Sequence, residues 1–339
     1  MTGKVTISQI AKMCGVSPAT VSLALNNKPG ISEETRSRIV AAARELGYLP
    51  SAGVSVRRAR ALSTIGMVVK TEPDLLPPAN PFYSQVIVGV DDACRDMGIN
   101  LLFAMLPVDR HNRPVSAPPL LVNSAVDGLL MVGAFVDETI DAILGERVPP
   151  IVLVDGYSDT ESYDAVVSDN FGGAYQAVEY LIEQGHRHIG LIGSEPDCYP
   201  SLAERRHGYL RALKEHDIGE TYLADFNVNR SQGGEETAVL LTAHPEVTAL
   251  FCVNDNVAVG AMQAAHRLGR QVPSDLAIVG YDDTYLATSV SPALTTMHVD
   301  TRAMGRAAVH LLALRLEKPD AARSTLIVHP NLIVRDSSG

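Results

Sequence analysis

The sequence predicts an α + α/β protein with an N-terminal helical head, a hinge, and a larger body of two α/β lobes. Three observations lead to this class. The 339 residues are about twice the length of a typical single domain, so several domains are expected. Residues 1–49 contain the start and stop signals of three helices. From residue 64 onward, short apolar runs alternate with amphipathic helices, which indicates parallel sheets covered on both faces.

The composition is that of a globular chain with substantial cores. Apolar residues make up 46% and charged residues 20%, which excludes a disordered protein or a coiled coil. No apolar run approaches ~18 residues and the first residues lack the apolar stretch of a signal peptide, so we expect a cytoplasmic protein without membrane association. The four cysteines form no Cys-x-x-Cys pair and are interpreted as free thiols.

The charges are divided unevenly along the chain. Residues 1–60 carry nine basic and three acidic side chains, whereas residues 61–339 carry 19 basic and 36 acidic ones. A basic head on an acidic body is typical of a module that binds a polyanion and is attached to a soluble domain.

The first two helices of the head have clear boundaries. Thr6 and Gln9 fit a capping box that starts the first helix, and Gly15 can adopt the left-handed conformation that ends it. Ser17 is the expected N-cap of the second helix, with Pro18 in its first turn.

A third helix is predicted from the N-cap Ser32 to the stop signal at Gly47. Helical spacing predicts one small core from all three helices, formed by Ile7, Ile10, Ala11, Val21, Ala24, Leu25, Ile39, Ala42, Ala43 and Leu46. Two short helices, a tight turn and a bracing helix make a helix-turn-helix module, whose second helix enters the major groove of DNA.

Residues 6–26, 31–36 and 46–50 closely resemble the DNA-binding head of the lactose-repressor (LacI) family. The resemblance implies base-facing positions at Pro18, Ala19 and Leu23, with phosphate contacts around them. Many members have arginine where this chain has Leu23, which can pack on a thymine methyl but cannot pair with guanine. The DNA-binding residues implied in the head are Thr6, Ser17, Pro18, Ala19, Thr20, Ser22, Leu23 and Asn26.

The hinge, residues 50–63, departs from the family. Its counterpart folds into a helix on DNA, and a leucine from each subunit enters the minor groove. Ungapped counting places Arg57 at the leucine position and a one-residue shift places Val56 there. We expect Val56 to be the wedge and Arg57, Arg58 and Arg60 to lie along the phosphates or the narrow groove. A plain flexible basic linker is the alternative.

The body, residues 64–339, is predicted to contain two lobes of one architecture, because similar runs begin at Ile65 and Ile189. We expect lobe 1 to comprise about residues 64–164 and 291–320, and lobe 2 about 165–290 and 321–339. The predicted strands are 65–69, 101–104, 128–132, 151–154, 189–192, 250–253 and 277–280. The predicted helices are 82–97, 137–146, 172–185, 202–216, 235–243, 256–268 and 301–316.

The family resemblance continues through the body, in segments that include 80–83, 126–128, 169–170, 185–189, 280–283 and 292–296. It implies the fold of periplasmic sugar-binding proteins, with an effector in a cleft at the carboxyl ends of the strands. The effector contacts that it implies are Phe82, Tyr83, Arg205, Asn254 and Asp282.

Each of these positions also has a structural interpretation. Phe82 and Tyr83 can be core residues, Arg205 can lie on a helix surface, and Asp282 can cap a loop. Asp169 fits a helix cap better than a ligand contact. Ten residues, Lys70–Ala79, separate the first strand from Asn80 where about four are usual in the family, so we expect this loop to line or cover the site.

Enzyme motifs are missing from the sequence. It contains no phosphate-binding Gly-x4-Gly-Lys-Ser/Thr loop, no Gly-x-Gly-x-x-Gly after a predicted strand, and no Gly-x-Ser-x-Gly turn. His186 and His188 bracket an arginine in a predicted turn, where packing is favoured over metal binding. We expect no enzyme activity, metal or cofactor.

The sequence therefore predicts a homodimeric transcription regulator, a repressor that binds a pseudo-palindromic operator in double-stranded DNA and a sugar or nucleoside-like effector. The effector can release DNA or promote its binding; both senses fit. No heptad tail follows Arg335, which favours a dimer over a tetramer. The alternative is a cytoplasmic sugar-binding or sugar-modifying protein with a non-functional head.

Overall fold

A computed structural model describes residues 6–25, 30–46, 62–71, 81–109, 111–123, 126–136, 140, 144, 148–160, 162–196, 198–228 and 233–339. The chain divides into two compact units, Met1–Ala61 and Leu62–Gly339. Most of the expected hinge, and nearly all of the expected loop Lys70–Ala79, lie outside the described residues. Across the described ranges, no helix is long and apolar enough to span a bilayer.

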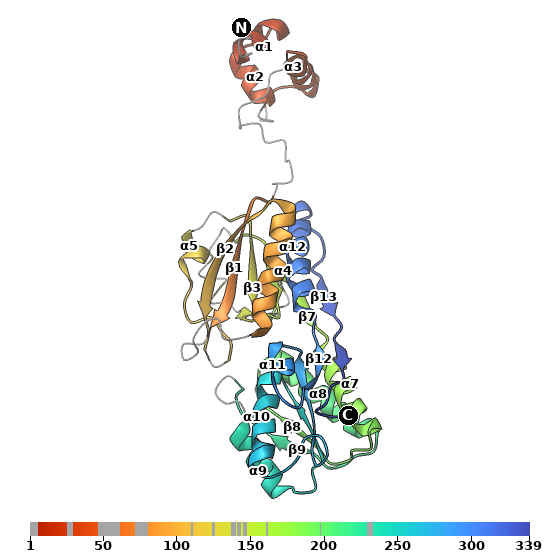
Figure 1. Cartoon of the computed structure of the whole chain (residues 1–339). Helices are drawn as coiled ribbons and strands as arrows, with labels where there is room; N and C mark the ends of the chain where they lie inside the picture. The colour runs from red at the N-terminus through yellow and green to blue at the C-terminus, as the bar shows by residue number, and fades with distance from the viewer. Residues whose placement is uncertain are drawn as a thin grey trace. The chain divides into compact units, whose positions relative to one another are not determined.

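The described residues of the head form three helices, α1 (Ile7–Cys14), α2 (Pro18–Leu25) and α3 (Glu33–Glu45) (Figure 1). The amide of Thr6 donates to Gln9 Oε1 at 2.8 Å, and Gly15 ends α1 with φ 62°. The hydroxyl of Ser17 accepts from the amide of Thr20 at 3.0 Å, which caps α2. Ser32 caps α3 in the same way. The predicted caps are therefore confirmed, and the core centres on Ile10, Ala11, Val21, Ala24, Leu25, Ile39 and Ala43.

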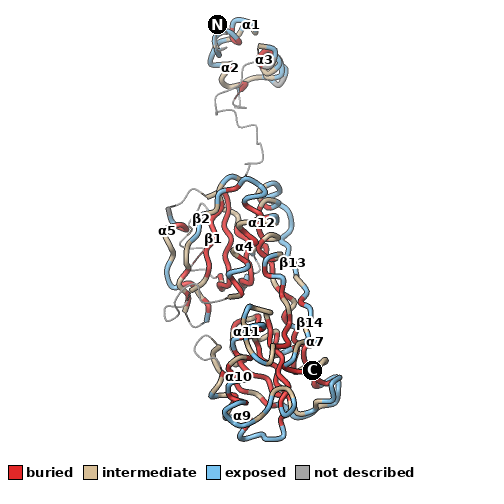
Figure 2. The backbone as a smooth tube through the Cα atoms, in the orientation of Figure 1, coloured by how far each residue is buried: buried red, intermediate tan, exposed pale blue. Residues whose placement is uncertain are grey.

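The first lobe has a six-stranded sheet in the order β13-β7-β5-β3-β1-β2, with every neighbouring pair parallel. Gly66 and Gly128 leave room for leucine side chains that cover its faces. Figure 2 shows how deeply its central strands are buried. The strands are β1 (Thr64–Thr71), β2 (Asn100–Pro107), β3 (Gly128–Val132), β5 (Ile151–Val154), β7 (Asp164–Ser168) and β13 (Thr325–Val328). The two-residue strands β4 (Phe135–Val136) and β6 (Tyr157–Ser158) pair beside it.

The second lobe repeats this arrangement in the order β14-β12-β11-β10-β8-β9, with only β14 antiparallel. β1 and β8 occupy the same place in the strand order of their sheets, as do β5 and β11. The predicted repetition of one architecture is therefore confirmed. The strands are β8 (Ile189–Ile192), β9 (Tyr222–Ala224), β10 (Ala249–Cys252), β11 (Ala277–Asp282), β12 (Thr295–His298) and β14 (Asn331–Ile333).

Helices cover the sheets in pairs. The helices of the body are α4 (Pro81–Met97), α5 (Pro119–Asn123), α7 (Asn170–Glu183), α8 (Pro200–Glu215), α9 (Gly234–Ala243), α10 (Asp255–Arg267), α11 (Tyr285–Ser289) and α12 (Thr301–Glu317). In lobe 1, α4 packs against α12 so closely that a Cβ at Gly89 would lie 2.1 Å from the carbonyl oxygen of Arg302. In lobe 2, α7 pairs with α8 and α9 with α10 (Figure 1). The predicted helix 137–146 lies mostly outside the described residues.

The chain crosses between the lobes three times, from β7 to α7, from β12 to α12 and from β13 to β14. The expected lobe limits are therefore wrong in detail. β7 and β13 complete the first sheet, and β12 belongs to the second. The first two crossings follow the fifth strand of a sheet, and the third follows the sixth strand of the first sheet. The reason for the difference is that an apolar strand pattern does not reveal which sheet the strand joins. Asp169 and Asp300 cap the helices after the first two crossings.

Candidate nucleic-acid interface and effector site

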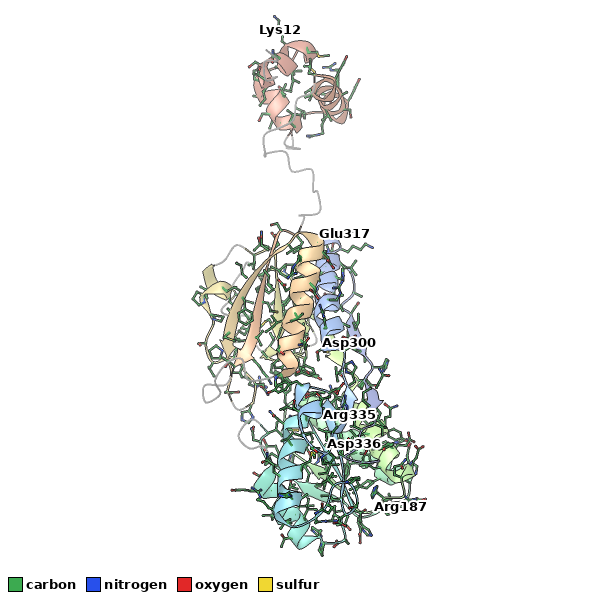
Figure 3. The ribbon with its side chains drawn as sticks, in the orientation of Figure 1. Lys12, Arg187, Asp300, Glu317, Arg335 and Asp336 are labelled. Atoms are coloured by element: carbon green, nitrogen blue, oxygen red, sulfur yellow. The ribbon has the colours of Figure 1, made fainter. Side chains whose placement is uncertain are left out.

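Five of the DNA-binding residues implied in the head lie on α2, Ser17 directly precedes that helix, and Thr6 is the exposed N-cap of α1. Ser17, Pro18 and Ala19 are exposed, and Thr20, Ser22 and Leu23 are half-buried, while the opposite side of the helix forms the core. Lys12 projects from the bundle into solvent (Figure 3). The predicted contacts Asn26, Val56, Arg57 and Arg58 lie outside the described residues.

Arg36 of α3 fixes the end of α2. Its guanidinium donates to the carbonyl oxygens of Leu23 and Ala24 at 3.3 Å each. These carbonyls belong to the last turn of α2, where helical partners are in general missing. The arginine therefore orients α2 in the bundle while the outer side of the helix keeps its small side chains accessible.

In the body, Arg205 of α8 is the centre of a buried polar network. Its side chain is only 6% exposed, so it is not a surface residue. The guanidinium donates to Asn170 Oδ1 at 3.0 Å, to the Val253 carbonyl at 2.5 Å and to Asp282 Oδ1 at 3.2 Å. It also stacks 3.7 Å from the centre of the Tyr281 ring. These contacts tie the start of α7 and the ends of β10 and β11 to α8.

Asp282 is held at the end of β11 in an unusual environment. Its φ of 100° is a conformation that residues with a Cβ rarely adopt, and such strain is typical of functional positions. Burial raises the pKa of its carboxyl to about 7, although Arg205 acts in the opposite direction. Asp255 lies behind it and supports the same loop, accepting from Thr284 and Thr296. Burial raises the pKa of Asp255 to about 6.

A second set of contacts joins the two lobes. Tyr83 of α4 donates to Asp155 Oδ2 at 2.8 Å within lobe 1, and burial raises the pKa of that tyrosine. Tyr199, which precedes α8 in lobe 2, donates to the carbonyl oxygen of Asp155 at 2.7 Å. Asp155 follows β5 with φ 44°, as Asp282 ends the corresponding strand β11. Each lobe therefore places a strained aspartate at the same point of its sheet.

Glu204 makes a further cross-lobe contact. Its Oε2 accepts from Tyr157 of β6 at 3.4 Å and from Asn170 of α7 at 3.2 Å. The rings of Tyr157 and Tyr199 meet edge to face at 5.3 Å. We call the whole set the inter-lobe cluster, which comprises Lys70, Tyr83, Asp155, Tyr157, Asn170, Tyr199, Glu204, Arg205 and Asp282.

The structure brings together three of the five predicted effector residues. Tyr83, Arg205 and Asp282 belong to the inter-lobe cluster. Phe82 is buried in the core beside Tyr83, at a ring distance of 5.3 Å. The side chain of Asn254 caps α10 by accepting from the amide of Val257.

Sequence reasoning missed Asp155, Tyr157, Tyr199 and Glu204 as site residues. The available signal was their position, because all four lie just after the predicted strands 151–154 and 189–192 or at the start of the helix that follows. Asp169 caps α7, as predicted. His186 pairs with Thr248 and His188 with Tyr222, so the two histidines have separate partners. No cluster of metal-ligating side chains occurs in the described part of the chain.

Family comparisons match both parts of the chain. The family "Bacterial regulatory proteins, lacI family" matches residues 6–51, and the "Periplasmic binding protein-like domain" matches residues 178–338. Both sequence-based expectations, the helix-turn-helix head and the bilobal α/β body, are confirmed.

Full-length relatives agree with this division. The ribose operon repressor of Haemophilus influenzae is 32% identical over 336 residues, and the repressor PurR of Mannheimia succiniciproducens is 30% identical over 335 residues. Each alignment covers 98% of both chains. A solved complex of the transcriptional regulator CelR with cellobiose is 30% identical, with a TM-score of 0.70 over 98% of this chain and 100% of the other. The chain therefore belongs to the LacI family of bacterial transcription regulators.

Proposed function

We propose that this protein is a homodimeric, cytoplasmic repressor whose affinity for its operator is set by a small molecule bound at the inter-lobe cluster. The observation that carries the proposal is the coexistence of two different surfaces in one chain. The head presents small, accessible side chains on one short helix, whereas the body holds buried charged groups at the boundary between two lobes.

The head acts through α2. Pro18, Ala19 and Leu23 face base edges in the major groove, while Ser17, Thr20 and Ser22 contact phosphates, as does Thr6. Two heads of a dimer read the two halves of a pseudo-palindrome. Asn26, Val56, Arg57 and Arg58 complete the proposed DNA-binding set and contribute phosphate and minor-groove contacts.

The body responds to the effector through a change in the separation of its two lobes. Phe82 and Tyr83 support the effector from lobe 1, and Arg205, Asn254 and Asp282 contact it or position its contacts from lobe 2. An effector with hydroxyl or amide groups replaces the direct contacts between Tyr199 and Asp155 and between Tyr157 and Glu204. The three crossings then carry the change in lobe separation to the start of β1, where the head is attached. The difference in effector affinity between the two lobe arrangements is the coupling free energy.

The proposal is tested by selecting fragments of genomic DNA on the purified full-length protein. It predicts enrichment of a symmetric sequence that is bound at least 100-fold more tightly than random duplex at ~100 mM salt. A sugar-binding protein with a non-functional head would bind ligands but enrich no sequence.

A thermal-shift screen of sugars, nucleosides and purines is the experiment that identifies the effector. Two relatives are named PurR and ribose operon repressor, and a structural neighbour was solved as a complex with cellobiose. A compound that raises the melting temperature and changes operator affinity is the effector.

A further inference from the structure

We propose that Glu204 is a specificity-determining residue, which selects effectors that offer it a hydroxyl or amine donor and rejects those that place a phosphate or carboxylate near it. This inference rests on the proposed function, because it assumes that the effector binds at the inter-lobe cluster. It concerns the charge of the effector and not its identity.

Glu204 lies at the boundary between the two lobes. It belongs to the first turns of α8 and directly precedes Arg205. Its two partners come from different lobes, since Tyr157 is in β6 and Asn170 begins α7. A ligand that binds between Tyr157 and α8 would therefore come into contact with the Glu204 carboxylate.

The partners of Glu204 are neutral and only partly satisfy it. The Tyr157 contact is 3.4 Å long, whereas a hydroxyl donating to a carboxylate normally lies about 2.5–2.7 Å away. Asn170 shares its amide nitrogen with the carbonyl oxygen of Ser168 at 3.1 Å. A carboxylate has about four acceptor sites, so capacity remains for a donor from a ligand. Within the described ranges, no lysine or arginine forms an ion pair with Glu204, unlike Asp282.

The charge balance of the inter-lobe cluster also favours a neutral effector over an anionic one. Two cations, Lys70 and Arg205, face three carboxylates, those of Asp155, Glu204 and Asp282. Arg205 is committed to Asp282, and Lys70 donates to Asn112 at 2.7 Å. Burial raises the pKa of all three acids, which means that negative charge is already unfavourable there. An anionic ligand would add to this charge at low dielectric, whereas a hydroxyl would donate to it.

The surrounding rings suit a neutral ligand with flat apolar faces. Tyr157 and Tyr199 form an edge-to-face pair, and Lys70 lies 4.6 Å from the centre of the Tyr199 ring. Aromatic side chains of this kind pack against the apolar face of a sugar ring or of a base. Neutral compounds rich in hydroxyl groups therefore match the cluster in both charge and shape.

The test compares full-length wild type with Glu204→Gln, which keeps the size of the side chain and removes its charge. Glu183→Gln is the matched control, because Glu183 is exposed at the end of α7. The probes are neutral and phosphorylated pairs: ribose and ribose 5-phosphate, glucose and glucose 6-phosphate, inosine and inosine monophosphate. Thermal shift identifies the pair that binds, and calorimetry gives both dissociation constants.

Wild type and Glu183→Gln are expected to bind the neutral member at least tenfold more tightly than its phosphate. Glu204→Gln is expected to reduce that ratio at least fivefold, by weakening the neutral member and improving the phosphate. The inference is overturned if wild type prefers a phosphate, if no neutral member binds, or if Glu204→Gln keeps the wild-type ratio. A separate titration with operator DNA tests the proposed function. A ligand that binds with the expected preference but leaves operator affinity unchanged contradicts the proposed function and not the role of Glu204.

Discussion

The head and the inter-lobe cluster use polar side chains in opposite ways. In α2 the proposed contacts are close in sequence, small, and accessible on the outer side of one helix of eight residues. In the cluster the contacts come from segments more than 200 residues apart, are large and charged, and are mostly buried. A surface that reads DNA needs access, whereas a site that senses a small molecule needs desolvated groups whose partners change when the ligand enters. Substitutions in the two regions should therefore have different consequences.

The largest effect is expected for Arg205→Ala, which leaves Asp282 buried without its cation. Breaking a buried ion pair by removing one partner costs about 3–5 kcal/mol, so the free energy of unfolding of the body should fall by that order. Urea denaturation followed by circular dichroism measures the change. Arg205→Lys is the companion variant, which keeps the charge but loses the fork that reaches three acceptors, and should be intermediate. A loss below about 1 kcal/mol for alanine would show that the network does not hold the lobe together.

The next effect is a dependence of stability on pH that arises from Asp282. Its folded pKa, about 7, is above the ordinary value, so the folded protein binds this proton more tightly than the unfolded chain does. This contribution to stability is complete below about pH 4 and is lost as the pH rises through about 7. Relative to Asp282→Asn, wild type should lose about 2–4 kcal/mol between pH 4 and pH 8.

Thermal and urea unfolding at several pH values provide the measurement for Asp282. Asp320→Asn, at an exposed position, is the control and should follow wild type. Parallel pH curves for wild type and Asp282→Asn would mean that the carboxyl titrates at its ordinary value.

In the head, Leu23→Ala should reduce discrimination at one base pair without changing the body. The leucine is proposed to pack on a thymine methyl, and its loss should reduce the preference for thymine by about 1 kcal/mol, or roughly fivefold. Lys12→Ala is the contrasting variant, because we expect this exposed lysine to contact a phosphate. Loss of a phosphate contact weakens binding to all sequences alike and lowers the salt slope by about 0.9. Anisotropy titrations on operator variants at several salt concentrations separate the two patterns. Uniform weakening by Leu23→Ala would contradict its base-facing position.

An effect of similar size, here on the stability of the body, is expected for Tyr199→Phe. The substitution removes the 2.7 Å hydrogen bond to the Asp155 carbonyl and keeps the ring. One hydrogen bond contributes about 1 kcal/mol, so the free energy of unfolding of the body should fall by about that amount. Tyr285→Phe, at a residue that is 69% exposed, serves as the control in the same denaturation experiment. If the two variants were equally stable, the cross-lobe hydrogen bond of the Tyr199 hydroxyl would not contribute to stability.

The contrast also explains what the sequence could predict. The caps at Thr6, Ser17 and Ser32 and the apolar stripes of the head depend on neighbouring residues, so local rules found them. The strands 128–132, 151–154 and 189–192 were predicted with the bounds that the structure has, because each is a continuous buried run.

The lobe limits and much of the site depend on topology instead. Which sheet β7, β12 and β13 join is decided by the three crossings. Arg205 and Asp282 were identified through family resemblance, and their contact spans 77 residues. Tyr199 and Glu204 meet lobe 1 only because the two lobes face each other. Their position after the predicted strand 189–192 could mark them as candidates, but it does not give their partners in lobe 1.

The most direct test of the account is a closed thermodynamic cycle of operator and effector on the full-length protein. Linkage requires that the effector change operator affinity by the same factor by which operator changes effector affinity. We predict a common factor of at least five in wild type, abolished by Arg205→Ala, which should still bind operator without effector. Equal operator affinity with and without every ligand that binds the body would contradict the account.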